Sequence, residues 1–174
     1  MSARLRQEQG FGLIELLAAL VMISVGILAI LLTLNSGVLA LHRSAQVSTA
    51  AAIADRQMEL YRGLRFDSVF LDAASAAAAD ATYTGDSAYS ASSLMTKTCS
   101  PLAPECTPTQ SVPGPDGRTY RLDTYVVCTD LAGGLIACPA TPSQAYLKRV
   151  TVVVRKPGEA TSLARIVSTF GKSF

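Results

Sequence analysis

The distribution of apolar residues divides the chain into one long apolar run near the N-terminus and a more polar remainder. Between Phe11 and Leu41 the only ionisable side chain is Glu15, and the uncharged stretch 16–41 has 26 residues. As an α-helix, this stretch would be about 39 Å long at about 1.5 Å per residue, whereas the hydrocarbon core of a bilayer is about 30 Å thick. The pattern therefore predicts a membrane-spanning helix over about residues 14–41.

The pattern after the apolar run predicts that the helix continues beyond the membrane. Apolar residues recur at spacings of three and four, which marks one face of a helix: Val47, Ala50, Ala54, Met58 and Tyr61. Glu59 and Arg62 lie off this stripe, three residues apart, where two side chains can pair on a helix surface. Gly63 is a helix stop signal. We therefore expect one helix over residues 11–65, with a membrane half and an amphipathic half.

The last third of the chain alternates between apolar and polar positions, which is typical of strands. The turn-prone residues 113–117 precede this pattern, and Gly133-Gly134 and Pro157-Gly158 interrupt it. Three strands are predicted, with core faces formed by Tyr120, Leu122, Thr124, Val126 and Cys128; Lys148, Val150, Val152 and Val154; and Ala164, Ile166, Ser168 and Phe170. These short intervals predict a small antiparallel sheet over residues 118–174.

A sheet with one apolar face needs a cover, and the amphipathic half of the helix is the available one. The predicted fold class is therefore α+β, with a long N-terminal helix packed on a small antiparallel sheet. Residues 66–117 are rich in Ser, Thr, Gly and Pro and have no sustained period. We interpret them as a variable connecting region.

All four cysteines follow the apolar run: Cys99, Cys106, Cys128 and Cys138. An even number beyond a membrane segment favours disulfides in an oxidising compartment. Four cysteines allow three pairings, and we favour the two local ones, Cys99–Cys106 and Cys128–Cys138. The alternatives are free thiols in a cytosolic domain and a zinc site. The C-x6-C and C-x9-C spacings and the absence of a nearby histidine disfavour zinc.

The charged residues predict an orientation in the membrane rather than a nucleic-acid partner. Lys and Arg exceed Asp and Glu by 15 to 13, and the charges are scattered, which does not favour nucleic-acid binding. Arg4 and Arg6 precede the apolar run, and positive charge on the short N-terminal side predicts that this end stays in the cytoplasm. The C-terminal domain is then expected on the other side, in agreement with disulfides. The run is longer than the apolar region of a secretory signal peptide.

Glu15 is the unusual residue of the apolar run. An acidic side chain at the centre of a membrane helix costs about 2.5–3.5 kcal/mol, and less toward the interface. The span contains no cation to pair with it, so a partner has to come from another chain or from a newly made N-terminal amine. The segment Gly10-Phe11-Gly12-Leu13-Ile14-Glu15-Leu16-Leu17 resembles the class III leader site of type IV prepilins and pseudopilins.

This resemblance implies a processing and assembly pathway. Prepilin peptidase would cut between Gly10 and Phe11, remove residues 1–10 as a leader, and N-methylate Phe11. Glu15 would neutralise the Phe11 amine of a neighbouring subunit, because an ion pair is stronger in a low dielectric than in water. The implied partners are prepilin peptidase, other pilin subunits, the inner-membrane assembly machinery and the lipid bilayer. The chain would cross the inner membrane once, and its C-terminal domain would be periplasmic or extracellular in the assembled pilus.

A narrower resemblance is to the minor pilins known as type IV pilus modification proteins (PilV-like). It rests on residues 11–34, residues 50–60 and the pattern of residues 147–154. Leu32 stands where many major pilins carry a helix-kinking proline. We therefore predict a minor type IV pilin. The alternatives are a type II secretion pseudopilin and a minor subunit whose loop 84–117 binds a surface ligand or DNA.

Catalysis finds little support in the sequence. His42 is the only histidine and ends the apolar run, so the folded domain offers no base for a Ser-His-Asp triad. The chain has no phosphate-binding loop and no metal-binding helix motif. Scattered loop carboxylates are interpreted as solvated turn residues: Asp67, Asp72, Asp80, Asp86, Asp116 and Asp130. We expect no enzyme activity, cofactor, metal or small-molecule substrate; the alternative is an exported enzyme on an uncleaved anchor.

Overall fold

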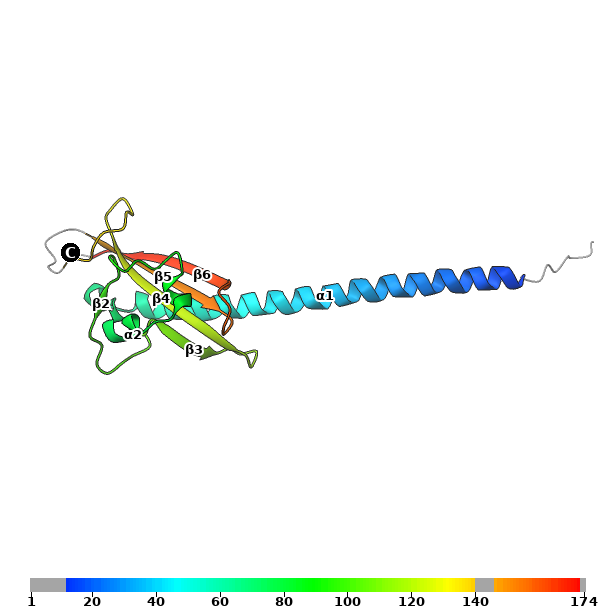
Figure 1. Ribbon diagram of the computed structural model, residues 1–174, viewed down its shortest axis with the longest axis horizontal. Helices are drawn as coiled ribbons and strands as arrows, with labels where there is room; N and C mark the ends of the chain where they lie inside the picture. Colours follow the sequence, from blue (N-terminus) through cyan, green and yellow to red (C-terminus); the bar gives the residue numbers. More distant parts are fainter. Residues whose placement is uncertain (1–11, 140–145, 173–174) are drawn as a thin grey trace, which may run out of the picture. The chain divides into compact units, whose positions relative to one another are not determined.

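The computed structural model describes residues 12–139 and 146–172 (Figure 1). These fall into two compact units, Met1–Ser44 and Ala45–Phe174, which are described separately below. The 50-residue helix α1 (Leu13–Arg62) contributes to both units. The other elements belong to the second unit: η1 (Phe66–Ser68), β1 (Leu71–Asp72), α2 (Ala73–Ala77), α3 (Ala81–Thr84), β2 (Thr96–Lys97), β3 (Thr109–Pro113), β4 (Thr119–Thr129), β5 (Leu147–Arg155) and β6 (Ser162–Phe170).

The second unit is built on a four-stranded sheet with the order β3-β4-β5-β6, in which every neighbouring pair is antiparallel. Strands β1 and β2 form a separate parallel pair. Helix and sheet together confirm the predicted α+β fold class. The helix ends at Arg62, one residue before Gly63 and short of the expected residue 65.

Strand β3 was missed by the sequence prediction, which expected three strands and placed the start of the sheet at residue 118. The strand has five residues, ends in Pro113, and shows only half-buried and exposed positions. Its alternation is therefore too weak to separate it from the connecting region. The turn after it fixes its pairing: the amide of Gly114 donates to the Arg118 carbonyl at 2.7 Å, and Gly117 has a φ of 72°. The sheet thus starts at Thr109.

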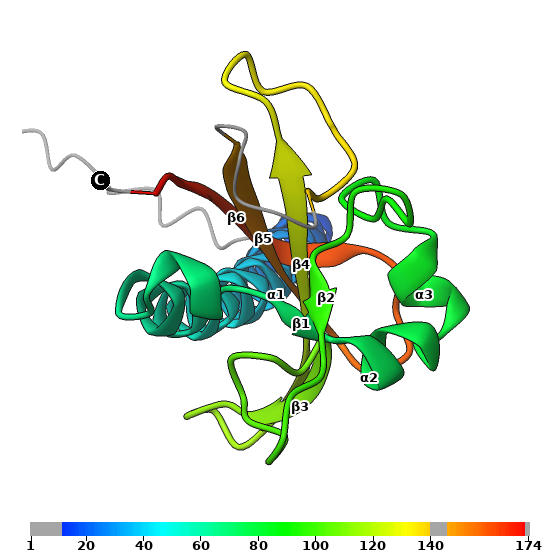
Figure 2. The same cartoon turned by 90° about the vertical axis from the view of Figure 1, so that its left-hand side faces the viewer.

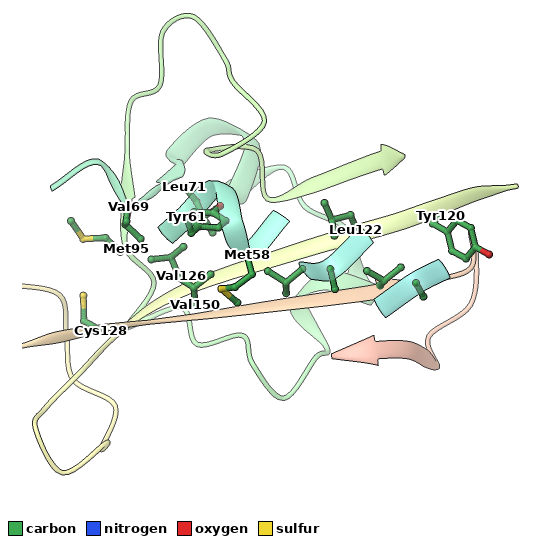
Figure 3. Close-up of a cluster of buried hydrophobic side chains, with 14 residues drawn as sticks. Met58, Tyr61, Val69, Leu71, Met95, Tyr120, Leu122, Val126, Cys128 and Val150 are labelled. Carbon is green, nitrogen blue, oxygen red and sulfur yellow. The ribbon is translucent and has the colours of Figure 1, made fainter. Parts of the chain in front are cut away.

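The main core lies between α1 and one face of the sheet (Figure 3). The predicted helix stripe is fully buried at Ala50, Ala54, Met58 and Tyr61, whereas Val47 is 41% exposed. The sheet contributes Tyr120, Leu122, Val126, Cys128, Val150, Val152 and Val154. The Glu59–Arg62 pair forms on the exposed side of the helix, as its spacing predicts.

The second face of the sheet is also covered, which the sequence did not predict. Tyr83 of α3 stacks on Tyr125 of β4 with ring centroids 4.4 Å apart, and both side chains are buried. The Tyr83 hydroxyl donates to the Thr124 carbonyl at 2.7 Å, and the Tyr125 hydroxyl donates to the Tyr83 carbonyl at 3.1 Å. Part of the connecting region therefore packs on the sheet. Figure 2 shows α3 on the side of β4 away from α1.

A buried ion network ties the same segment to the sheet. Arg155 of β5 pairs with both Asp86 and Asp123, and these three side chains are at most 4% exposed. Arg165 of β6 also donates to Asp86, at 2.6 Å. Burial opposes ionisation of Asp86, but the Arg165 hydrogen bond and the nearby charges lower the pKa of its carboxyl below the usual 3.8. The interpretation of Asp86 as a solvated turn residue is therefore wrong.

Lys148 of β5 is a second buried charge, on the helix-facing side of the sheet. Its side chain is fully buried, and its ammonium donates to the carbonyls of Phe66 and Val69 at 2.7 and 2.8 Å. Burial, together with the charge of Lys97, lowers the pKa of Lys148 from 10.5 to about 8, while Asp67 opposes this shift. The lysine therefore loses its proton more readily in the folded chain than in the unfolded one.

This shift predicts a Lys148 contribution that raises stability between pH 8 and pH 10; toward pH 10 it is opposed by the buried tyrosines, whose pKa values are raised, so it is read as the difference between the wild type and a Lys148 variant. In that range the unfolded chain still binds the Lys148 proton whereas the folded chain releases it, so the free energy of unfolding rises with pH. The gain over the interval is of order 2–3 kcal/mol. Urea unfolding of the full chain in non-ionic detergent, at several pH values, measures it. A Lys148→Met variant should lack the rise, and an equal rise in that variant would contradict the assignment.

Two disulfides lie in the second unit. They join Cys99 to Cys106 and Cys128 to Cys138, with Cα–Cα distances of 6.5 and 5.2 Å, and the described residues contain no free cysteine. These are the two local pairings. The first closes a loop beside Asp72, whose carboxylate accepts from the Cys99 amide at 3.1 Å. The second fastens the segment after β4 to the end of that strand.

Candidate functional site

The first turn of α1 contains the acidic residue that the sequence singled out. The amides of Glu15 and Leu16 donate to the Gly12 carbonyl at 2.9 and 3.2 Å, which begins the helix. Glu15 is exposed, and an acidic side chain in the first turn is favoured by the helix dipole. Gly10 and Phe11, the predicted cleavage and methylation residues, lie outside the described residues. The structure therefore contains one member of the predicted site.

Among the residues that the structure describes, none covers the apolar run that follows Glu15. Every large apolar side chain from Leu13 to Leu41 is between 50% and 81% exposed. The segment has the length and composition of a membrane span. So large an apolar surface requires lipid or other helices around it. The first unit is therefore suited to a membrane or to a bundle of similar helices.

The hydroxyl groups of this segment are satisfied inside the helix. Ser24 donates to the Leu20 carbonyl at 2.8 Å, Thr33 to Ile30 at 2.8 Å, and Ser36 to Thr33 at 2.9 Å. Internal satisfaction of polar groups is what a lipid environment demands. Glu15 differs from these residues, because no ion pair involving it occurs among residues 12–139 and 146–172. A single carboxylate is thus the one charged group on a long apolar surface.

Comparison with known families identifies this segment. Residues 5–33 match the prokaryotic N-terminal methylation motif. This match supports a type IV pilin-like protein. No curated protein and no solved structure matches it. The motif implies that this pilin-like protein is processed by prepilin peptidase and assembles with other pilin subunits.

The matched region includes the residues that the sequence analysis predicted for cleavage, methylation and assembly. It contains Gly10, Phe11 and Glu15 and ends at Thr33, inside the apolar run. Together with the exposed apolar helix it indicates a single-pass membrane anchor. The motif occurs in both pilins and pseudopilins, so it supports the pilin-like group without distinguishing between these two classes. Its relatives by motif are structural rather than catalytic, and among the described residues no cluster of His, Cys, Asp or Glu is arranged to hold a metal ion.

The folded unit of the pilin-like protein also contains a feature that the sequence did not indicate. A groove of about 580 Å³ lies between α1 and the edge strand β3. Its floor and walls are mostly apolar, and its lining includes Ala52, Ile53, Leu60, Val112, Pro113 and Leu122. A third of the lining comes from β3 and β4, and β3 was not predicted. One apolar residue of the groove, Leu60, lies off the buried stripe of the helix. A single exposed leucine is too common on protein surfaces to predict a groove.

Proposed function

We propose that this protein is a minor type IV pilin, a structural and assembly subunit of a pilus. The observation that carries the proposal is the methylation motif at residues 5–33, with Glu15 at the head of an apolar helix that the chain leaves uncovered. A helix of this kind reaches a low-energy state in the bilayer and again among the helices of a filament. The proposal therefore accounts for both the membrane segment and its acidic residue.

The proposed topology follows from charge and from redox chemistry. Residues 1–10 are a leader on the cytoplasmic side, the helix crosses the inner membrane once, and the folded unit lies outside the cytoplasm. Arg4 and Arg6 support this orientation through the positive-inside rule. The disulfides Cys99–Cys106 and Cys128–Cys138 support it because such bonds persist in oxidising compartments.

Glu15 has a defined part in the proposed assembly. Cleavage after Gly10 gives Phe11 a new, positively charged amine, and the Glu15 carboxylate of an adjacent subunit neutralises it. Each of the two charges is costly in lipid when alone, and pairing them in a low dielectric offsets much of that cost. The pair sets the axial position of one helix against the next, because either charge shifted by a turn would face lipid.

The first test is the intact mass and N-terminal sequence of the protein purified from membranes of its own host. We expect a chain that starts at methylated Phe11. A Gly10→Leu variant should keep the leader, because a bulky side chain next to the scissile bond obstructs the peptidase. Gly12→Ala is the matched control: a Cβ there meets only the Ile14 side chain, at 3.9 Å, so processing should continue. A wild-type chain that begins at Met1 or Ser2 would refute the proposal.

A second measurement separates the pilus from its closest alternative. Deletion of the gene should abolish or reduce surface pili while leaving type II secretion intact. The reverse result would make the protein a pseudopilin, which carries the same motif. Binding of a surface ligand or DNA through residues 84–117 stays a prediction of the sequence; deleting that loop should then spare assembly and abolish binding.

A further inference from the structure

The segment after β4 presents two exposed leucines on a short loop. Leu131 is 72% exposed and Leu135 is 51% exposed, and only Ala132, Gly133 and Gly134 separate them. Single exposed leucines are ordinary on protein surfaces, but two on one tight turn form a compact apolar knob. We call residues 130–136 the leucine loop. Figure 2 shows it as the yellow loop that extends from the end of β4, on the opposite side of the unit from β3.

The leucine loop is held in a defined conformation. The amide of Asp130 donates to the Gly134 carbonyl at 2.9 Å, and the amide of Gly134 donates to the Asp130 carboxylate at 2.7 Å. Gly133 has a φ of 88°, which a side chain would disfavour. At the base, the Ile136 amide donates to the Cys128 carbonyl, and the Cys128–Cys138 disulfide closes the segment. The knob is therefore ordered before it meets a partner, which lowers the entropy cost of binding.

The groove between α1 and β3 is an apolar concave surface, complementary to the apolar leucine loop. It is apolar, open to solvent and of a size typical for clefts that take a bulky apolar group. Ala52 and Leu60 are exposed within it, and Leu60 is 44% exposed. The groove and the leucine loop are distinct surfaces of the same unit, so one copy can offer its loop while its own groove stays open.

Charge complements the apolar match. Arg56 lines the groove and is exposed, whereas Asp130 lies at the base of the leucine loop. Neither side chain forms a salt bridge within the described part of the chain. A loop that enters the groove brings a carboxylate toward an available guanidinium, which favours this arrangement over a random apolar contact.

We propose that the leucine loop of one copy of this chain docks into the α1–β3 groove of a second copy. The contact is heterologous, because it joins two different surfaces, and such contacts repeat into rings or open-ended assemblies rather than two-fold dimers. The proposal rests on the proposed pilin function and requires that one assembly contains at least two adjacent copies of this chain. It adds to the membrane helix a second contact, made by the folded unit.

Site-specific photo-cross-linking in the host tests this contact. A benzophenone amino acid replaces Leu131 in the full chain, and two differently tagged copies are co-expressed. Irradiation should give a product that carries both tags. The same probe in place of Val167, which is 53% exposed on β6 and belongs to neither the loop nor the groove, should give none.

Two groove variants decide whether the product reports the proposed docking. Ala52→Arg fills the groove and should reduce the cross-linked product at least tenfold. Ser48→Arg is the matched control, because Ser48 is exposed on α1 and does not line the groove; it should leave the yield unchanged. Arg56→Glu, which adds no bulk, should also lower the yield, and the salt dependence of the product should weaken with it.

The outcomes separate this inference from the proposed function. A processed chain that starts at Phe11 but gives no two-tag product would overturn the docking proposal and leave the pilin function intact. The docking proposal is equally overturned if the product contains a different subunit, or if Ala52→Arg leaves its yield unchanged. A chain that keeps its leader would instead show that the proposed function fails.

Discussion

A Glu15→Leu variant should still be cleaved after Gly10 and yet be absent from assembled filaments. Cleavage depends on the residues around the scissile bond, and Glu15 lies four residues beyond Phe11 in the first turn of α1. Assembly depends on the charge, because the Phe11 amine of a neighbour then has no counter-ion in a low-dielectric environment. At an effective dielectric constant of about 20, a pair 4 Å apart contributes about 4 kcal/mol. We expect a loss of at least tenfold.

Immunoblotting of sheared filaments and of membranes from the same cells gives the ratio of assembled to unassembled protein. Glu15→Gln keeps the shape of the side chain and removes the charge, so it should fail like Glu15→Leu. Leu16→Ile is the control, because it alters the same turn of the helix without a change of charge. If Glu15→Gln enters filaments at the wild-type level, the carboxylate has no role in assembly and another feature must set the position of the helices.

The second large effect is expected at Arg155. An Arg155→Met variant should lose up to about 3–5 kcal/mol of stability, because it removes the cation that the buried carboxylates of Asp86 and Asp123 share. Arg165 still contacts Asp86, whereas Arg121 is the remaining cation beside Asp123, at 2.9 Å. Urea unfolding of the full chain in detergent, followed by the near-ultraviolet circular dichroism of the tyrosines, measures the loss.

Arg62→Met is the matched control for this prediction. Arg62 also pairs with a carboxylate, that of Glu59, but both side chains are more than half exposed. Exposed pairs contribute about 0–1 kcal/mol, so the control should differ little from the wild type. If the two substitutions lower the free energy of unfolding equally, burial does not make the Arg155 ion pairs more stabilising than an exposed pair.

The features that sequence analysis recovered are those with a short repeat. The apolar run, the stripe at Ala50, Ala54 and Met58, and the alternation in β4, β5 and β6 each depend on residues a few positions apart. Such periods reflect the geometry of the helix and the strand themselves. The N-terminal motif is equally local, which is why the chain could be recognised as pilin-like from its first third.

The features that it missed join distant residues. Asp86 meets Arg155 across 69 positions, and Lys148 reaches Val69 across 79. Tyr83 and Tyr125 stack from elements 42 residues apart, and together they cover the face of the sheet that was expected to be open. No local period carries this information, because the cost of burying a charge or a hydroxyl depends on what lies opposite it in space.

The sequence by itself determined that this protein has an apolar helix with one carboxylate near its start, an amphipathic extension and an antiparallel sheet. Hydrophobic periodicity specifies these elements because each one has to bury a single face. Only the tertiary structure decided that Thr109–Pro113 joins the sheet, that residues 80–89 pack on its second face, and that a groove remains beside β3. Those outcomes depend on pairings between segments whose own patterns are weak, and they become definite only when the chain is folded.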